Sequence, residues 1–191
     1  MEGPRDRVPH APADAFSPHR QSEPFQLLIR VSTGSGVGPT RLAAFDSALF
    51  AAGVAHFNLV RLSSVIPPNA VVHEVAGSDQ ISGANGDLAY CVYADAYAST
   101  TGEQAWAGIA WAAHEDRSGA RIFVEQTAAS ESRLLHDLRV TIEAMSITRG
   151  GRYRVVGQTV GSAVCADHPV CAVVVAAYGT SRWSDLLNSE G

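Results

Sequence analysis

The chain has 191 residues, of which 46% are hydrophobic and 17% charged, and its net charge is −5. This length and composition suit one domain with a sizeable core and exclude a largely disordered chain. A mildly acidic chain without a basic run lacks the charge that nucleic acid or an anionic membrane would require in a partner. No apolar stretch approaches the roughly 20 residues of a membrane span, and no signal peptide is recognisable, so a cytoplasmic protein is expected.

The side-chain inventory limits the chemistry. All 14 basic residues are arginine, so no lysine amine is available to hold pyridoxal phosphate. The three cysteines, Cys91, Cys165 and Cys171, are too few for a disulfide framework and are expected to be buried packing residues. The histidines show no paired spacing, so no metal site is predicted.

Residues 1–24 hold five of the nine prolines and almost no large apolar residues, which predicts a disordered tail. The domain is expected to begin with a strand from Phe25 to Val31. A glycine-rich turn, Thr33–Gly38, should follow this strand. Its G-x-G-x-G spacing does not match a dinucleotide- or phosphate-binding loop. A turn that another chain or a ligand approaches closely remains possible at that spacing.

A helix is predicted to begin after Thr40, which serves as its N-cap, and to stop at Gly53. Its apolar residues recur at helical spacing, and Asp46 shares their face or its edge. An acid on the buried side of a helix needs a partner. Asp46 is therefore either a paired structural residue or a contact for a cationic ligand.

The rest of the chain reads as strands with one further long helix. That helix is Ser130–Thr148, whose apolar residues form a single stripe. The segment Glu103–Ala113 is ambiguous, because its alanines favour a helix whereas its tryptophans and isoleucine suit a buried strand. The strands predicted after the first helix are Asn58–Leu62, Ala70–Val75, Leu88–Tyr97, Arg121–Gln126, Tyr153–Val164 and Val170–Tyr178. Together these elements predict a single α+β domain.

A serine pair, Ser63-Ser64, stands at the end of a short strand and shortly before Pro67-Pro68. A double proline cannot continue a strand ladder, so the chain must turn there. Taken alone, the two hydroxyls would satisfy backbone groups at the strand end. No G-x-S-x-G element surrounds them, so a hydrolase nucleophile is not indicated.

The string Asn58-Leu-Val-Arg-Leu-Ser-Ser-Val-Ile-Pro-Pro68 closely resembles the self-cleavage site of the pyruvoyl-dependent arginine decarboxylases. The likeness covers about Phe25 to Tyr178. Further matching segments are Ala44–Leu49, Leu88–Asp95, Thr101–Glu103, Phe123–Glu125 and Cys171–Tyr178. The segment Gly77–Asp87 departs from the family, because it is polar where the family has an apolar, proline-containing stretch.

The resemblance implies a fold and an assembly. The fold would be a compact α/β sandwich of layered helices and sheets, self-cleaved between Ser63 and Ser64 into a β chain of residues 1–63 and an α chain of residues 64–191. These αβ units would form homo-trimers or hexamers with active sites between neighbours. In the cleavage reaction the Ser64 hydroxyl attacks the Ser63 carbonyl, and residue 64 becomes a covalent pyruvoyl cofactor.

The resemblance also implies residue roles. Asn58 matches the residue that stabilises the oxyanion during cleavage, and its amide is a suitable donor. Glu125 matches the acid that protonates the substrate carbon after carbon dioxide has left. Asp46 matches the aspartate that contacts the substrate guanidinium. Gly36 lies in the glycine-rich segment expected near the substrate.

The activity implied is decarboxylation of L-arginine to agmatine, a polyamine precursor. Two alternatives stay open on the residues alone. The same cofactor could act on a different amino acid, since Gly77–Asp87 departs from the family. The chain could instead be a relative that never cleaves and serves as the assembly partner of an active paralogue.

Overall fold

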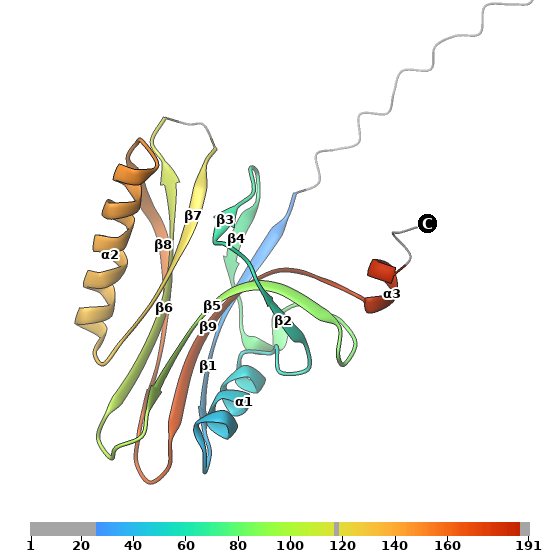
Figure 1. Ribbon diagram of the computed structural model, residues 1–191, viewed down its shortest axis with the longest axis vertical. Helices are drawn as coiled ribbons and strands as arrows, with labels where there is room; N and C mark the ends of the chain where they lie inside the picture. The colour runs from blue at the N-terminus through green and yellow to red at the C-terminus, as the bar shows by residue number, and fades with distance from the viewer. Residues whose placement is uncertain (1–25, 117–118, 188–191) are drawn as a thin grey trace, which may run out of the picture.

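The computed structural model describes residues 26–116 and 119–187, so the tail predicted for residues 1–24 lies outside the described residues. Two β-sheets stack face to face, and one long helix covers the outer side of each (Figure 1). One sheet has the strand order β2-β5-β9-β1-β4 and the other has β3-β7-β6-β8. In chain order the elements are β1 (Leu28–Val37), α1 (Arg41–Ala51), β2 (Asn58–Arg61), β3 (Val65–Ile66), β4 (Val71–Glu74), the 3₁₀ turn η1 (Gly77–Asp79), β5 (Leu88–Ala98), β6 (Gln104–His114), β7 (Arg121–Ala128), α2 (Glu131–Thr148), β8 (Tyr153–Val164), β9 (Val170–Ser181) and α3 (Trp183–Leu187).

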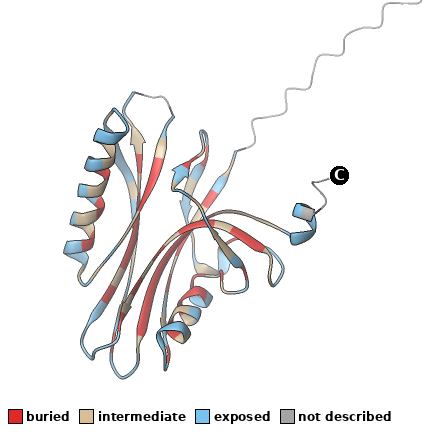
Figure 2. Ribbon diagram, in the orientation of Figure 1, coloured by how far each residue is buried: buried red, intermediate tan, exposed pale blue. Residues whose placement is uncertain are grey.

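Three apolar layers hold the elements together, and Figure 2 shows the buried residues along the strands and on the inner sides of the helices. The central layer lies between the two sheets and includes Phe123, Ile109 and Val174. A second layer lies between α1 and the five-stranded sheet. The third lies between α2 and the four-stranded sheet. The layered α+β sandwich expected from the sequence is therefore present.

The strand β9 explains why one sheet can be buried on both faces. Every residue from Val170 to Ala177 is buried. Alternate residues such as Val174 face the other sheet, and those between them such as Val173 face α1. A strand covered on both sides needs a continuous apolar run, which is what this segment supplies.

The first strand runs further than predicted, because β1 extends to Val37 and absorbs the segment expected to be a glycine-rich turn. Gly34 and Gly36 are two residues apart and lie on the same face of the strand. A Cβ at Gly36 would lie 2.3 Å from the Ala44 carbonyl oxygen, and one at Gly34 would lie 2.0 Å from that of Ala48. The glycines therefore allow α1 to pack directly on the strand, and the predicted turn is wrong.

The helix α1 begins and ends as predicted, and of its predicted apolar stripe Leu49 and Ala52 are buried and Phe45 packs against the same layer. The Ala43 amide donates to Thr40 Oγ1 at 3.1 Å, which confirms the N-cap, and Gly53 follows the helix with φ 80°. The buried residues of α1 are small alanines together with Leu49, whereas Leu42 is 76% exposed. Asp46 is exposed and therefore does not lie on the buried side.

Other predictions are resolved by the sheet topology. Glu103–Ala113 forms β6, because it lies between β7 and β8 and only a strand can pair with both. Helix α2 and its N-cap Ser130 are confirmed. The short β3, η1 and α3 were not predicted.

All three cysteines are buried and free, as expected. Among the described residues, no helix is long and apolar enough to cross a membrane.

Candidate active site

The serine pair lies where the chain passes from one sheet to the other. The strand β2 ends at Arg61 on the edge of the five-stranded sheet, and β3 begins at Val65 on the edge of the four-stranded sheet. Between them, Ser63 is exposed and Ser64 is half-buried. Ser64 has φ 66°, a left-handed conformation that a residue with a Cβ adopts only at a cost. The backbone is therefore strained at the Ser63–Ser64 junction.

Ser64 is held against Glu125 by the pairing of β3 with β7. Val65 pairs with Ile122, and the Phe123 amide donates to the Ser64 carbonyl at 2.8 Å. Ser64 Oγ then donates to Glu125 Oε1 at 2.6 Å, although the two residues are 61 positions apart in the chain. A short hydrogen bond between a hydroxyl and a carboxylate is strong, and it points the hydroxyl proton at a base. The pair can therefore exchange a proton.

Tyr178 from β9 supports the same junction. Its hydroxyl donates to the Val65 carbonyl at 3.0 Å, and its ring packs on Phe123 with ring centroids 6.0 Å apart. Burial, and then the nearby Glu125 carboxylate, raise the pKa of Tyr178 above its usual value. The phenol therefore stays protonated at neutral pH and remains a donor to the first residue of β3.

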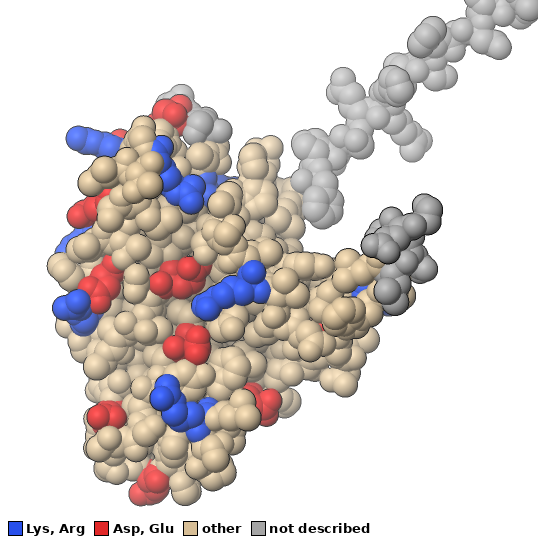
Figure 3. All heavy atoms as spheres, viewed as in Figure 1, with Lys and Arg blue, Asp and Glu red and all other residues tan. Residues whose placement is uncertain are grey.

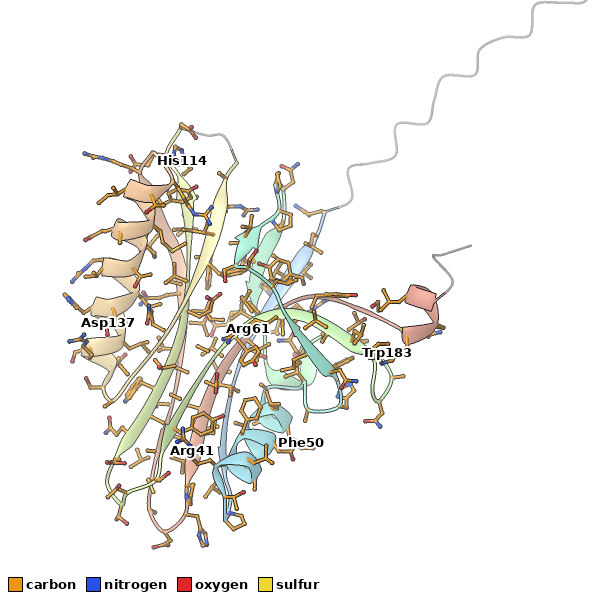
Figure 4. The ribbon with its side chains drawn as sticks, viewed as in Figure 1. Arg41, Phe50, Arg61, His114, Asp137 and Trp183 are labelled. Atoms are coloured by element: carbon orange, nitrogen blue, oxygen red, sulfur yellow. The ribbon has the colours of Figure 1, made fainter. Side chains whose placement is uncertain are left out.

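A small cavity of about 240 Å³ opens beside Glu125. Arg61 enters it from the end of β2, and its guanidinium lies 4.3 Å above the Tyr93 ring while it also donates to the Tyr93 carbonyl (Figure 4). The residues lining this cavity are Arg61, Ala94, Asp95, Glu125, Gln126 and Thr127. Arginine and acidic side chains are interspersed on this face of the molecule (Figure 3). The cavity can therefore hold a polar ligand next to the Ser64–Glu125 pair.

Asp46 lies in a different cavity, of about 780 Å³, on the outer side of the five-stranded sheet. It shares this cavity with residues from the end of α1 and from the segment around η1. On the helix surface Asp46 lies between Leu42 and Phe50, which are 76% and 81% exposed. A single chain thus does not bring Asp46 to the cavity of Glu125.

Asn58 and Gly36 have other neighbours than Ser64. Asn58 Nδ2 donates to the Gly86 carbonyl at 2.7 Å. Asn58 begins β2 and Ser64 follows its end, and the two side chains have different hydrogen-bond partners. Gly36 packs under α1 and is not among the residues that line these cavities. The roles given to these two residues stay predictions.

The structure adds residues that sequence reasoning did not single out. Arg61 lies inside the recognised string, so the string itself was a signal. Tyr178 ends the matching segment Cys171–Tyr178, but that likeness did not indicate a contact with the serine junction, and Gln80 in a polar loop carried no signal. Only the tertiary fold brings Tyr178 to Val65 and places Gln80 in the cavity of Asp46.

Comparison with known proteins gives one family. Residues 28–182 match the family described as pyruvoyl-dependent arginine decarboxylase. A protein of that name from Halobacterium salinarum is 38% identical over 162 residues, which are 80% of this chain and 94% of the relative. A second, from Methanothermobacter thermautotrophicus, is 31% identical over 90 residues, covering 47% of this chain and 56% of the relative. A third, from Methanopyrus kandleri, is 58% identical over 38 residues, covering 20% and 25%.

Proposed function

Because the chain belongs to the pyruvoyl-dependent arginine decarboxylase family, we propose that it decarboxylates L-arginine to agmatine and carbon dioxide after cleaving itself between Ser63 and Ser64. The observation that carries this proposal is the hydrogen bond from the strained Ser64 to Glu125. It supports the proposal because a serine hydroxyl, a carboxylate and a left-handed residue meet at one junction within the matched region.

Residue 64 suits the covalent cofactor that the family name implies. The pyruvoyl group would supply a ketone that condenses with the substrate amine and accepts the electron pair left by carbon dioxide. Its precursor Ser64 is fixed through its carbonyl to Phe123, and the next residue, Val65, is fixed by Tyr178. These contacts do not involve residues before the junction. They would therefore keep residue 64 beside Glu125 after the chain is cut.

Glu125 is positioned to start maturation. As Ser64 Oγ forms a bond to the Ser63 carbonyl carbon, its proton passes to Glu125, and the Ser63–Ser64 C–N bond breaks to leave an ester. Loss of the Cα proton of residue 64 then expels Ser63 as a carboxylate and leaves dehydroalanine. Addition of water and loss of ammonia complete the conversion to the pyruvoyl group.

The two products of cleavage would remain associated. Residues 1–63 contribute β1, α1 and β2 to the fold. β1 lies between β9 and β4 in the sheet, and β2 pairs with β5. Separating the products would break these ladders and expose the layer beneath α1, including Ala44 and Val173. Hydrogen bonding and burial thus replace the lost covalent link.

During turnover Glu125 would return a proton to the substrate. Its carboxyl group lines the cavity next to residue 64, on the side where the substrate carbon must lie. An acid fixed there delivers its proton from one direction, which selects protonation of the substrate carbon. Glu125 therefore serves as base in maturation and as acid in turnover.

The location of Asp46 in a different cavity from Glu125, the partner of Ser64, supports a site shared between subunits. Asp46 lies between two large apolar side chains, Leu42 and Phe50, that a solitary chain would leave in water. We propose that the second copy that covers them also brings its own Ser64 to this Asp46. Trimers, or pairs of trimers, of αβ units meet this requirement.

In such a site Asp46 would bind the substrate guanidinium, since a carboxylate accepts two N–H bonds from one guanidinium. The Asn58 amide would stabilise the oxyanion during cleavage. A second candidate function is decarboxylation of another cationic amino acid. One observation favours it: residues of the segment 77–87, which differs from the family pattern, line the cavity of Asp46.

The proposal is tested by incubating purified protein separately with L-arginine, L-ornithine, L-lysine and L-citrulline and identifying the amines by mass spectrometry. We expect agmatine from arginine and little product from the others. Product from lysine or ornithine alone would support the second candidate. A fully cleaved protein that releases no amine from any of them would overturn the proposal.

A further inference from the structure

The cavity that contains Asp46 has a lining suited to a group that is positively charged and rich in N–H donors. The C-terminal end of α1 borders it at Ala51 and Gly53, and its carbonyls carry the negative end of the helix dipole. No basic residue lies in the last turn of α1. No arginine is among the described residues that line the cavity. His56 also lines the cavity, so it is the Asp46 carboxylate and the negative end of α1 that favour a cation there.

The opposite wall comes from the segment that departs from the family. Gly53 and Gly77 meet backbone to backbone, because a Cβ at Gly53 would lie 1.9 Å from the Gly77 carbonyl oxygen. This close contact fixes η1 against the end of α1 and directs Gln80 into the cavity wall. Gln80 is only 7% exposed, which is unusual for a glutamine.

One half of the Gln80 carboxamide is anchored. Ser32 Oγ donates its only hydrogen to the Ala52 carbonyl at 2.7 Å, so it can only accept from Gln80. Gln80 Nε2 donates to Ser32 Oγ at 2.6 Å and to the Arg30 carbonyl at 3.4 Å. Both partners can only accept a hydrogen bond here. The end of the carboxamide that faces them must therefore be the NH₂ group, and the oxygen lies at the other end.

The other half has no partner. Gln80 Oε1 is the one buried side-chain polar atom among the described residues without a hydrogen bond. An unpaired buried acceptor is costly, and proteins rarely keep one without a use for it. Because the oxygen is buried in the cavity wall, a ligand bonds to it when the neighbouring wall atoms move aside while Nε2 keeps its bonds to Ser32 and Arg30.

We infer that Gln80 determines substrate specificity by accepting, at Oε1, an N–H of the guanidinium that Asp46 binds, an inference that rests on the proposed function. A guanidinium has five N–H donors in one plane, so it can bond to Asp46 and to a second acceptor at the same time. A shorter side chain that ends in an ammonium would leave Oε1 unpaired. Gln80 therefore favours arginine over such substrates.

The test is Gln80→Met, which keeps the length of the side chain and removes its polar atoms. Ser32→Ala is the matched control, because it removes the anchor of Nε2 and leaves Oε1 in place. We expect Gln80→Met to be cleaved normally but to show at least a tenfold lower kcat/KM for arginine and an equally weakened Kd for agmatine. Ser32→Ala should change both values by less than about threefold.

Equal losses in the two variants, or an unchanged Gln80→Met, would overturn the inference and leave Gln80 a structural residue. Should Gln80→Met fail to be cleaved, Gln80→Glu keeps the shape and an acceptor oxygen. That variant must bind agmatine at least as tightly as the wild type, and weaker binding contradicts the inference. Failure of the proposed function is recognised separately, because the cleaved wild type would then release no agmatine from arginine.

Discussion

Ser64 is the one described serine that has all three of the following properties. Its backbone is left-handed, its hydroxyl donates to a carboxylate, and its carbonyl is held by the neighbouring strand. The left-handed backbone of Ser64 and the Glu125 carboxylate that accepts from it both lie at the Ser63–Ser64 peptide bond. An unstrained serine at a strand end would satisfy backbone groups and remain inert.

Glu125→Gln tests the proton transfer proposed for maturation. Glutamine keeps the size of the side chain and an oxygen acceptor for Ser64, but it cannot take up a proton. We expect self-cleavage to slow by roughly 10²–10⁴-fold, measured as the disappearance of the intact chain with time. Glu143→Gln, at an exposed position on α2, is the control and should be cleaved at the wild-type rate. Cleavage of Glu125→Gln at that same rate would assign the acid to turnover alone.

Asp46→Asn tests substrate recognition without touching the junction. Because Asp46 lines a separate cavity, the variant should fold and be cleaved like the wild type. Loss of a charged hydrogen bond to the guanidinium, about 1.5–3 kcal/mol, should lower kcat/KM for arginine by roughly 10- to 150-fold. The exposed Asp167→Asn should have no effect on kcat/KM. An unchanged kcat/KM in processed Asp46→Asn would show that another residue binds the substrate.

At the scale of elements, β1 and α1 show where sequence reasoning fails. Clustered glycines are typical of a turn, and nothing local reveals that a helix will cover them. Here Gly34 and Gly36 replace side chains that would collide with the backbone of α1. The same close packing buries the alanine face of the helix and turns Leu42 and Asp46 outward. The apolar spacing placed Leu49 correctly but also put Leu42 on the buried side, because it did not show that small alanines make the contact with β1.

Gly36→Ala should weaken the contact between α1 and β1. The new Cβ would meet the Ala44 carbonyl and the Ala48 amide at 2.3 Å, and backbone atoms in a helix cannot move independently. We expect the free energy of unfolding to fall by about 2 kcal/mol or more, measured by denaturant titration. Gly179→Ala is the control, because no atom lies within 4 Å of its Cβ. Equal stability of the two variants would contradict this packing account.

Elements with regular patterns were predictable, and those that depend on tertiary context were not. The stripe on α2 and the apolar run of β9 each specify one structure without reference to the rest of the chain. By contrast, the alanines of β6 suit helix and strand alike, and only its place between β7 and β8 decides. The two-residue β3 is too short to carry any pattern.

At the scale of the whole molecule, both cleavage products would contribute strands to the same five-stranded sheet. β1 and β2 would belong to one product, and β4, β5 and β9 to the other. The cut lies between β2 and β3, and these strands are edges of different sheets. The chain can therefore be opened there without interrupting a ladder. The sequence located the serine pair and Glu125 through the family resemblance, but their contact depends on β3 pairing with β7. It did not show that Asp46 lies in another cavity, since that depends on how α1 packs.

A site shared between subunits can be tested by mixing two defective variants. Asp46→Asn subunits retain Ser64 and Glu125, and Glu125→Gln subunits retain Asp46. Co-expression should restore arginine decarboxylation, because about a quarter of the interfaces would then combine the intact halves. Each variant expressed alone should stay weakly active. Absence of any restoration in verified mixed oligomers would place Asp46 and Glu125 in the same subunit's site.

The central claim, that the chain matures by cutting itself at Ser63–Ser64, is tested most directly by the intact mass of purified protein. The full chain is 20.1 kDa. From its 191 residues, cleavage predicts two pieces of about 6.6 and 13.5 kDa, in proportion to their lengths. The larger should resist Edman degradation, because its first residue would carry a ketone in place of an amine. A single 20.1 kDa species that persists in folded protein after long incubation would contradict the account.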